Sequence, residues 1–224
     1  MQNLESLEEI LGYSFKNKEL LVNALTHSSF ANEEEPGSDN ERLEFLGDAV
    51  LDMVISNKLF KELKSSREGD LTRLRAAIVC EKSLAKISKD KGINNYLRLG
   101  HGEEQSGGRT RNSIVADGME AIIGAVYVDS GFTAAAGVIE GLFEDAIRDA
   151  KEGKVIQDSK TKLQEKLQKN GPCSIEYKLI KEEGPDHAKL FTMAVYVNGK
   201  EEGIGMGKSK KEAQMAAAEA ALKE

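Results

Sequence analysis

Three carboxylates stand out in the segment Asn40–Asp52, which reads NERLEFLGDAVLD. Glu41, Glu44 and Asp48 follow one another at spacings of three and four residues, so on an α-helix they share one face. An ionised carboxylate only accepts hydrogen bonds, and packing several among apolar neighbours costs several kcal/mol each unless a cation offsets the charge. A hard divalent cation is the simplest explanation for this pattern.

A second acidic pair has a similar setting far along the chain. Asp117 and Glu120 lie three residues apart in the apolar run IVADGMEAII, and therefore also share a helical face. Two apolar helices that each carry an acidic stripe can bury themselves by packing together, which brings the stripes face to face. The resulting oxygen ligands suit Mg²⁺ or Mn²⁺ better than Zn²⁺.

Length and composition indicate an ordinary globular protein. The chain has 224 residues, 40% of them hydrophobic and 31% charged, which allows one large domain or two modest ones. No membrane span or secretory signal is predicted, so we expect a cytoplasmic protein without a membrane partner. Cys80 and Cys173 are too few and too far apart for a disulfide framework or a thiolate metal site.

The net charge of −7 is unevenly distributed. Residues 1–150 hold 17 Lys and Arg against 26 Asp and Glu, a net charge of −9, whereas residues 151–224 hold 14 against 12, a net charge of +2. The C-terminal part is therefore the better candidate for binding a polyanion, although the placement of its lysines must carry that case.

The first 150 residues have a helical period throughout and predict an all-α domain. Asp70 is a candidate cap for a helix beginning near Leu71. The glycine-rich segment 99–112 leads into the second acidic helix. It is either a plain mobile connector or a loop whose Arg109 and Arg111 touch a nucleic-acid backbone.

A polar linker at residues 151–157 separates this domain from a second one at residues 158–224. The linker contains Gly153, so we expect the second domain to swing relative to the first. The second domain is predicted to have the order α-β-β-β-α, a small antiparallel sheet with two helices on one face. Its strands are expected at 174–181, 188–197 and 201–207, with Asn198-Gly199 as a hairpin turn.

Both parts resemble one known family. NERLEFLGDAVLD and SIVADGMEAIIGAVYVDSG resemble the two acidic motifs of the bacterial ribonuclease III family, and ALTHSSF and GEEQSGGRTRNS match it as well. The C-terminal part is similar to a double-stranded-RNA-binding domain, through KTKLQEKLQ, GPDH and GKSKKEAQMAAAEAAL. The resemblance spans nearly the whole chain in the family's order.

The resemblance implies a Mg²⁺-dependent endoribonuclease, with Mn²⁺ able to substitute. Such an enzyme hydrolyses both strands of double-stranded RNA, leaving 5′-phosphate and 3′-hydroxyl ends with a short 3′ overhang, and processes ribosomal-RNA precursors and other structured RNAs. The positions that match the family's metal-binding carboxylates are Glu44, Asp48, Asp117 and Glu120, of which Asp48 and Glu120 are expected to be catalytic. Glu41 and Glu68 match further acidic residues around the cleavage site.

The resemblance also implies a homodimer, in which Phe45 projects into a pocket of the partner subunit. The alternative is that Phe45 is an ordinary core residue.

The second domain is expected to bind A-form RNA through its minor grooves and the phosphates between them. Lysines at a helix N-terminus oppose the helix dipole, so a polyanion partner accounts for them better than a solvated helix start does. Gln214 departs from the family pattern, which often places a lysine there, and Lys208 is a candidate to compensate. The expected RNA-binding residues are Thr161, Gln164, Glu165, Gln168, Pro185, His187, Lys208, Lys210 and Lys211.

Two other functions remain open at this point. One is a double-stranded-RNA-binding protein that does not cleave, whose acidic cluster is only structural. The other is an all-α nucleotide pyrophosphohydrolase, since such enzymes also bind Mg²⁺ on paired helical carboxylates.

Overall fold

The computed structural model describes residues 3–34, 39–152, 159–169, 171–185 and 189–223, without the side chains of residues 159, 161, 162 and 165. The chain forms two compact units, Met1–Val155 and Ile156–Glu224. Most of the expected linker lies outside the described residues. Each unit is described by itself.

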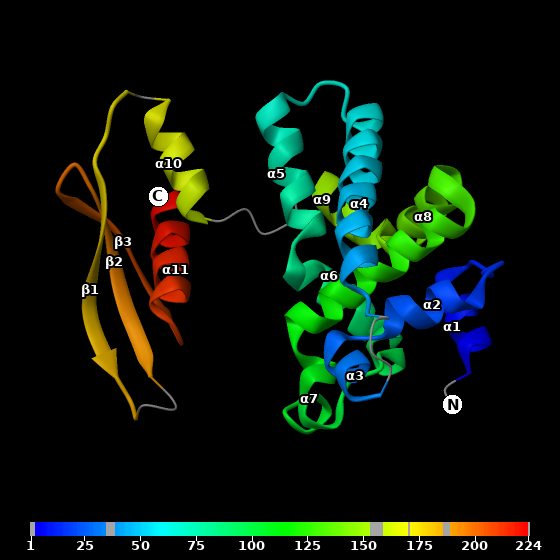
Figure 1. Ribbon diagram of the computed structural model, residues 1–224. Coiled ribbons are helices and arrows are strands. Elements are labelled where there is room, and N and C mark those ends of the chain that lie inside the picture. The colour runs from blue at the N-terminus through cyan, green and yellow to red at the C-terminus, as the bar shows by residue number, and fades with distance from the viewer. Residues whose placement is uncertain (1–2, 35–38, 153–158, 170, 186–188, 224) are drawn as a thin grey trace. The chain divides into compact units, whose positions relative to one another are not determined.

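The regular elements among the described residues of the first unit are all helices, and the unit has an extensive apolar core (Figure 1). This confirms the all-α prediction for the N-terminal part. Its α-helices are α1 (Leu4–Leu11), α2 (Lys18–Leu25), α3 (Ser28–Glu33), α4 (Glu41–Glu62), α5 (Glu68–Val79), α6 (Glu81–Asp90), α7 (His101–Gln105), α8 (Asn112–Leu142) and α9 (Glu144–Lys151). Two short 3-10 helices are η1 (Ile93–Tyr96) and η2 (Gly108–Thr110).

Helices α4 and α8 cross in direct backbone contact, and glycines make that contact possible. A Cβ atom on Gly47 of α4 would lie 1.8 Å from the carbonyl oxygen of Glu120, and one on Gly124 of α8 would lie 2.1 Å from that of Leu43. Any side chain at either glycine would push the helices apart. The crossing therefore holds the acidic residues of both helices close to each other.

Helix α8 is the central helix of the unit, and this explains its composition. It is long and apolar enough to cross a membrane by length and hydropathy alone, contrary to the expectation that no segment resembles a span. The physical reason is that α8 packs against α1, α2, α4 and α6, so it is apolar on several sides. Gly131 interrupts it with a left-handed φ of 78°.

Just before Gly131, Asp129 anchors the connection between α1 and α2 to α8. Its carboxylate accepts hydrogen bonds from the Tyr13 hydroxyl (2.5 Å) and from the backbone N–H groups of Lys16 and Asn17 (both 2.9 Å). These bonds lower the pKa of Asp129 despite its desolvation. These hydrogen bonds add a polar anchor to the apolar packing of α1 and α2 on the central helix.

The segment 99–112 is more structured than either sequence interpretation assumed, since it contains α7 and η2. The guanidinium of Arg109 donates to the carbonyls of Asn95 and Leu97 (both 2.8 Å) and to the carboxylate of Glu104 (2.9 Å). Arg111 pairs with Glu103 at 2.7 Å. Arg109 therefore ties this segment to the chain around η1.

Helix α5 also begins earlier than predicted. Arg67 is its N-cap, so Asp70 lies inside the first turn and pairs with Arg73. The predicted capping role of Asp70 is wrong. Its carboxylate instead complements the positive end of the helix dipole.

The second unit has the predicted order α-β-β-β-α. Its elements are α10 (Ser159–Gln168), β1 (Ile175–Glu183), β2 (Leu190–Val197), β3 (Lys200–Gly207) and α11 (Lys210–Lys223). The strands form one antiparallel sheet in the order β1-β2-β3, and both helices cover the same face (Figure 1). This confirms the fold class expected for the C-terminal part.

Alternating glycines let α11 lie directly on β3. A Cβ atom on Gly205 would be 2.0 Å from the backbone nitrogen of Ala217, and one on Gly203 would be 2.6 Å from its carbonyl oxygen. The predicted hairpin joins β2 to β3, with positive φ at both Asn198 (51°) and Gly199 (83°). Asparagine and glycine tolerate that conformation better than other residues, which is why this pair marks the turn.

Candidate active site

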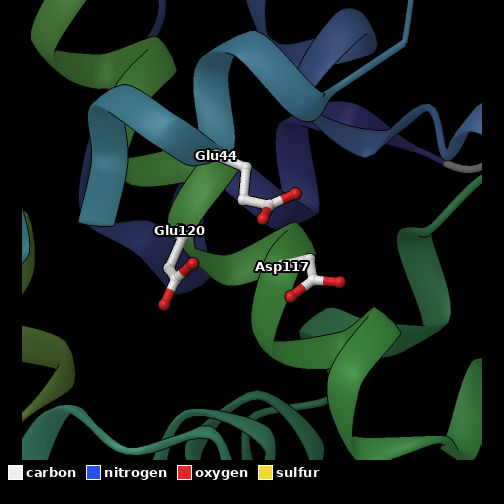
Figure 2. Close-up of side chains that lie close together, drawn as sticks. All are labelled: Glu44, Asp117 and Glu120. Atoms are coloured by element: carbon white, nitrogen blue, oxygen red, sulfur yellow. The ribbon is translucent and has the colours of Figure 1, made fainter. Parts of the chain in front are cut away.

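Three of the predicted carboxylates come together beside the crossing of α4 and α8. Glu44 of α4 and Asp117 and Glu120 of α8 each offer one carboxylate oxygen, and these oxygens all lie within 4.8 Å of one another. All three side chains are half-buried. Figure 2 shows them gathered on one side of the two helices.

This cluster is electrostatically costly when no cation is present. Burial, followed by repulsion from Asp48, raises the pKa of Glu120 to about 8. Burial also raises the pKa values of Glu44 and Asp117, and for Glu44 the largest charge contribution comes from Asp117. Carboxylates held together at such a cost mark a candidate functional site.

Two of the neighbours that tune Asp117 were not predicted from the sequence. His27 lowers the pKa of Asp117 and Glu81 raises it, each by less than burial does. His27 is also the N-cap of α3, where its Nδ1 accepts a hydrogen bond from the backbone N–H of Ser29 at 3.2 Å. These residues come from α3 and α6, so no spacing in the sequence links them to Asp117.

The other acidic residues expected at the site lie outside the cluster. Asp48 is exposed one turn after Glu44, although its charge acts strongly on Glu120. Glu41 is exposed in the first turn of α4, where it raises the pKa of Glu44. Glu68 is the first residue of α5, and its carboxylate accepts a hydrogen bond from the Thr72 hydroxyl at 3.0 Å.

The donor set fits a hard divalent cation. Three carboxylates whose pKa values are all raised, chiefly by burial, provide oxygen ligands and excess negative charge, the chemistry that Mg²⁺ and Mn²⁺ prefer. Among the residues that the structure describes, this is the group of three or more His, Cys, Asp and Glu side chains placed to hold a metal ion. No histidine or cysteine belongs to this group, which argues against a zinc site.

The expected RNA-binding residues of the second unit lie at its surface where the structure describes them. Gln164 and Gln168 are exposed on α10, and Pro185 is exposed after β1. Lys208, Lys210 and Lys211 are exposed around the N-terminus of α11. The side chains of Thr161 and Glu165, and residue His187, lie outside the described part.

Two side-chain-to-backbone hydrogen bonds, which resemble a capping box, start α11 and place its lysines. The Ser209 hydroxyl accepts from the backbone N–H of Glu212 (3.1 Å), and the Glu212 carboxylate accepts from the backbone N–H of Lys208 (2.8 Å). The three lysines therefore lie beside the positive end of the helix dipole, a favourable place for phosphate.

Phe45 is not a core residue. Its side chain is 81% exposed on α4, next to the acidic cluster. An exposed phenylalanine of this degree is typical of an interface rather than of a free surface. The structure thus excludes the core alternative within one subunit.

Comparison with known proteins decides the family. Residues 17–146 match a family model described as Ribonuclease-III-like, and residues 159–224 match one described as double-stranded RNA binding motif. The chain belongs to the ribonuclease III family.

Curated relatives extend the match to the full length. Ribonuclease 3 from Clostridium perfringens is 48% identical over 98% of this chain and 93% of its own length. Ribonuclease 3 from Enterococcus faecalis is 51% identical over 97% of this chain and 95% of its own. The solved nuclease domain of ribonuclease III from Campylobacter jejuni covers 64% of this chain and 98% of its own, at 46% identity and a TM-score of 0.61.

The protein is therefore an endoribonuclease specific for double-stranded RNA, with a helical nuclease domain and a C-terminal RNA-binding domain. The two other functions left open by the sequence, a non-cleaving binder and a pyrophosphohydrolase, are excluded by membership of this family.

Proposed function

We propose that Glu44, Asp117 and Glu120 bind the divalent cation with which this enzyme hydrolyses RNA, and that Asp48 completes the site from its exposed position. The observation that carries this proposal is the convergence of three half-buried carboxylates at the glycine crossing of α4 and α8. Mg²⁺ is the proposed ion, with Mn²⁺ as a substitute, because both take oxygen ligands.

A bound divalent cation would withdraw charge from the scissile phosphate and make an attacking water more acidic. The role of the chain's own carboxylates is to hold the cation in a fixed position. Glu120 and Asp117 are fixed on α8, and Glu44 is fixed on α4 by the backbone contact, so the site needs little rearrangement to bind a cation. Asp48, one turn after Glu44, is placed to orient water at the edge of the site.

We propose that Glu41 and Glu68 contribute negative charge around the cleavage site. Their exposure supports a role toward solvent or a partner subunit rather than a structural one. The products proposed are 5′-phosphate and 3′-hydroxyl ends with a short 3′ overhang, made from ribosomal-RNA precursors and other structured RNAs in the cytoplasm.

We also propose a homodimer in which Phe45 enters a pocket of the partner subunit. Its 81% exposure beside the acidic cluster supports this, because burial of a phenylalanine stabilises a complex by about 1.5–3 kcal/mol. The Campylobacter jejuni structure is described as flexible in a region involved in dimer formation. The division into residues 1–150, 151–157 and 158–224 is part of the same proposal.

Cleavage of a labelled RNA duplex tests the metal site. The wild type should cleave with Mg²⁺ and not with EDTA, whereas Glu120→Gln should lose at least 1,000-fold in cleavage rate and still bind the duplex in a gel-shift assay. Glu19→Gln, an exposed glutamate of α2, is the matched control and should cleave as the wild type does. Unchanged cleavage by Glu120→Gln would overturn the assignment.

A further inference from the structure

Two lysines at the N-terminal end of α11 share one side of the helix with a neutral residue, Gln214. Gln214 comes four residues after Lys210 and three after Lys211, so it shares their side of the helix. Lys208, the candidate from the sequence to compensate for this neutral position, lies before the helix, and its backbone N–H is bonded to Glu212. A positive charge that lies against Gln214 itself would come from another element of the fold.

The structure supplies it from α10. The Lys160 ammonium donates a hydrogen bond of 2.9 Å to the Oε1 atom of Gln214 and lies 4.6 Å from the centroid of the Tyr177 ring on β1. Lys160 is thus held between two helices and a strand, which reduces the side-chain entropy lost when it binds a ligand. Because Gln214 accepts through its oxygen, its carboxamide nitrogen keeps two N–H donors for a phosphate oxygen.

The position of Lys160 on α10 points to the same ligand. Lys160, Gln164 and Gln168 follow one another at four-residue intervals and form one stripe along the helix. The two glutamines are exposed, and they belong to the face proposed to enter the minor groove. Lys160 lies where this stripe meets the lysine-bearing end of α11.

We propose that Lys160 is a phosphate-binding residue of the RNA interface, which supplies the positive charge that Gln214 lacks and orients Gln214 as a second phosphate donor. The inference rests on duplex binding by the C-terminal domain. The proposal adds a residue of α10 to the phosphate contact that is otherwise assigned to the lysines at the start of α11.

The salt dependence of duplex binding by the full-length protein tests this, measured in EDTA so that the RNA stays intact. Lys160→Met should reduce the slope of log K against log salt by about one, because each phosphate contact releases about one counterion. Its deficit relative to the wild type should then change about three- to fourfold between 50 and 200 mM salt. Lys160→Arg should keep the wild-type slope.

Lys166→Met is the matched control. Lys166 is an exposed lysine of the same helix whose ammonium donates to the carbonyl of Leu222, near the C-terminal end of α11 (3.4 Å). Its loss should leave the slope unchanged. Equal slopes for Lys160→Met and the wild type, or equal changes for the two variants, would overturn the proposal.

A double variant that moves the positive charge from residue 160 to residue 214 separates phosphate binding from packing. The double variant Lys160→Met with Gln214→Lys should recover the wild-type slope, because the cation returns from the other side of the same contact. If Lys160 only packs on Tyr177, Lys160→Met lowers the melting temperature without changing the slope. Adding Gln214→Lys then does not restore the melting temperature. If the wild type cleaves duplex RNA but Lys160→Met binds it with the wild-type slope, only this inference is refuted. If the wild type neither binds nor cleaves duplex RNA, the proposed function is refuted.

Discussion

Glu120 has the largest number of acidic neighbours in the site. Asp48, Asp117, Glu44 and Asp52 all add to the effect of burial, which together raise its pKa to about 8. At neutral pH without a cation, Glu120 therefore holds a proton. A divalent cation must displace that proton, so metal binding and proton binding compete at this residue.

The metal-free protein should become less stable as the pH rises from about 4.5 toward 8. In this range the folded state keeps a proton on Glu120 that the unfolded state has lost, so the free energy of unfolding falls with pH. Glu120→Gln should flatten this dependence and be more stable at pH 8.5 by about 1–2 kcal/mol, a value reduced for solvent screening of a half-buried group. Melting temperatures in EDTA at pH 6, 7 and 8.5 measure this.

Saturating Mg²⁺ should reverse the trend, since the cation favours the ionised carboxylates, and its stabilisation should grow with pH in the wild type. If the melting temperatures of the wild type and Glu120→Gln changed with pH in the same way, the raised pKa of Glu120 would be contradicted.

At the scale of elements, the site depends on the close approach of α4 and α8. The acidic side chains belong to two helices, and Gly47 and Gly124 set how near those helices lie. Neither glycine has a side chain that could bind the cation. Both lie inside apolar helical segments, where an isolated glycine in the sequence indicates close backbone packing.

Gly47→Ala should destabilise the protein by about 3 kcal/mol or more, because its Cβ atom would meet the Glu120 carbonyl at 1.8 Å. It should also weaken Mg²⁺ binding, since separation of the helices moves Glu44 from Asp117 and Glu120. Urea unfolding and metal titration give the two readouts.

Gly137→Ala is the control for this prediction. Gly137 lies in α8, and a Cβ atom there would meet nothing within 4 Å, so the change should stabilise the helix by about 0.5–1 kcal/mol. Equal stabilities for the two alanine variants would refute the role of the crossing.

At the scale of the whole molecule, Phe45 connects the site with subunit assembly. It follows Glu44 directly in the chain, so a partner that binds Phe45 also borders the carboxylate cluster. Two symmetry-related copies would each bury one phenylalanine in an isologous interface. Dimerisation and the surroundings of the metal site are thus coupled in this proposal.

Phe45→Ala should weaken the dimer at least 100-fold, because two buried rings contribute about 3–6 kcal/mol together. Light scattering after size-exclusion chromatography, over a range of protein concentrations, measures the shift to monomer. Phe60→Ala is the control, since Phe60 is 72% exposed on the same helix about 22 Å farther along its axis. An unchanged dimer in Phe45→Ala would refute the assigned contact.

The sequence by itself determined the features that depend on local pattern. The helical period of residues 4–150, the three strands and the Asn198-Gly199 turn all follow from side-chain periodicity and backbone preference, and the structure confirms them. The acidic stripes of α4 and α8 were predicted for the same reason, because positions three and four residues apart share a helical face whatever the helix packs against.

Only the tertiary structure decided which of these groups meet. Asp48 lies on the predicted stripe yet outside the cluster, and Lys160 reaches Gln214 although 53 residues separate them. Periodicity fixes directions around one helix, but distances between helices depend on where their backbones touch. Here the glycine contacts fix the crossing of α4 with α8, and the packing of α10 on α11 fixes the pairing of Lys160 with Gln214.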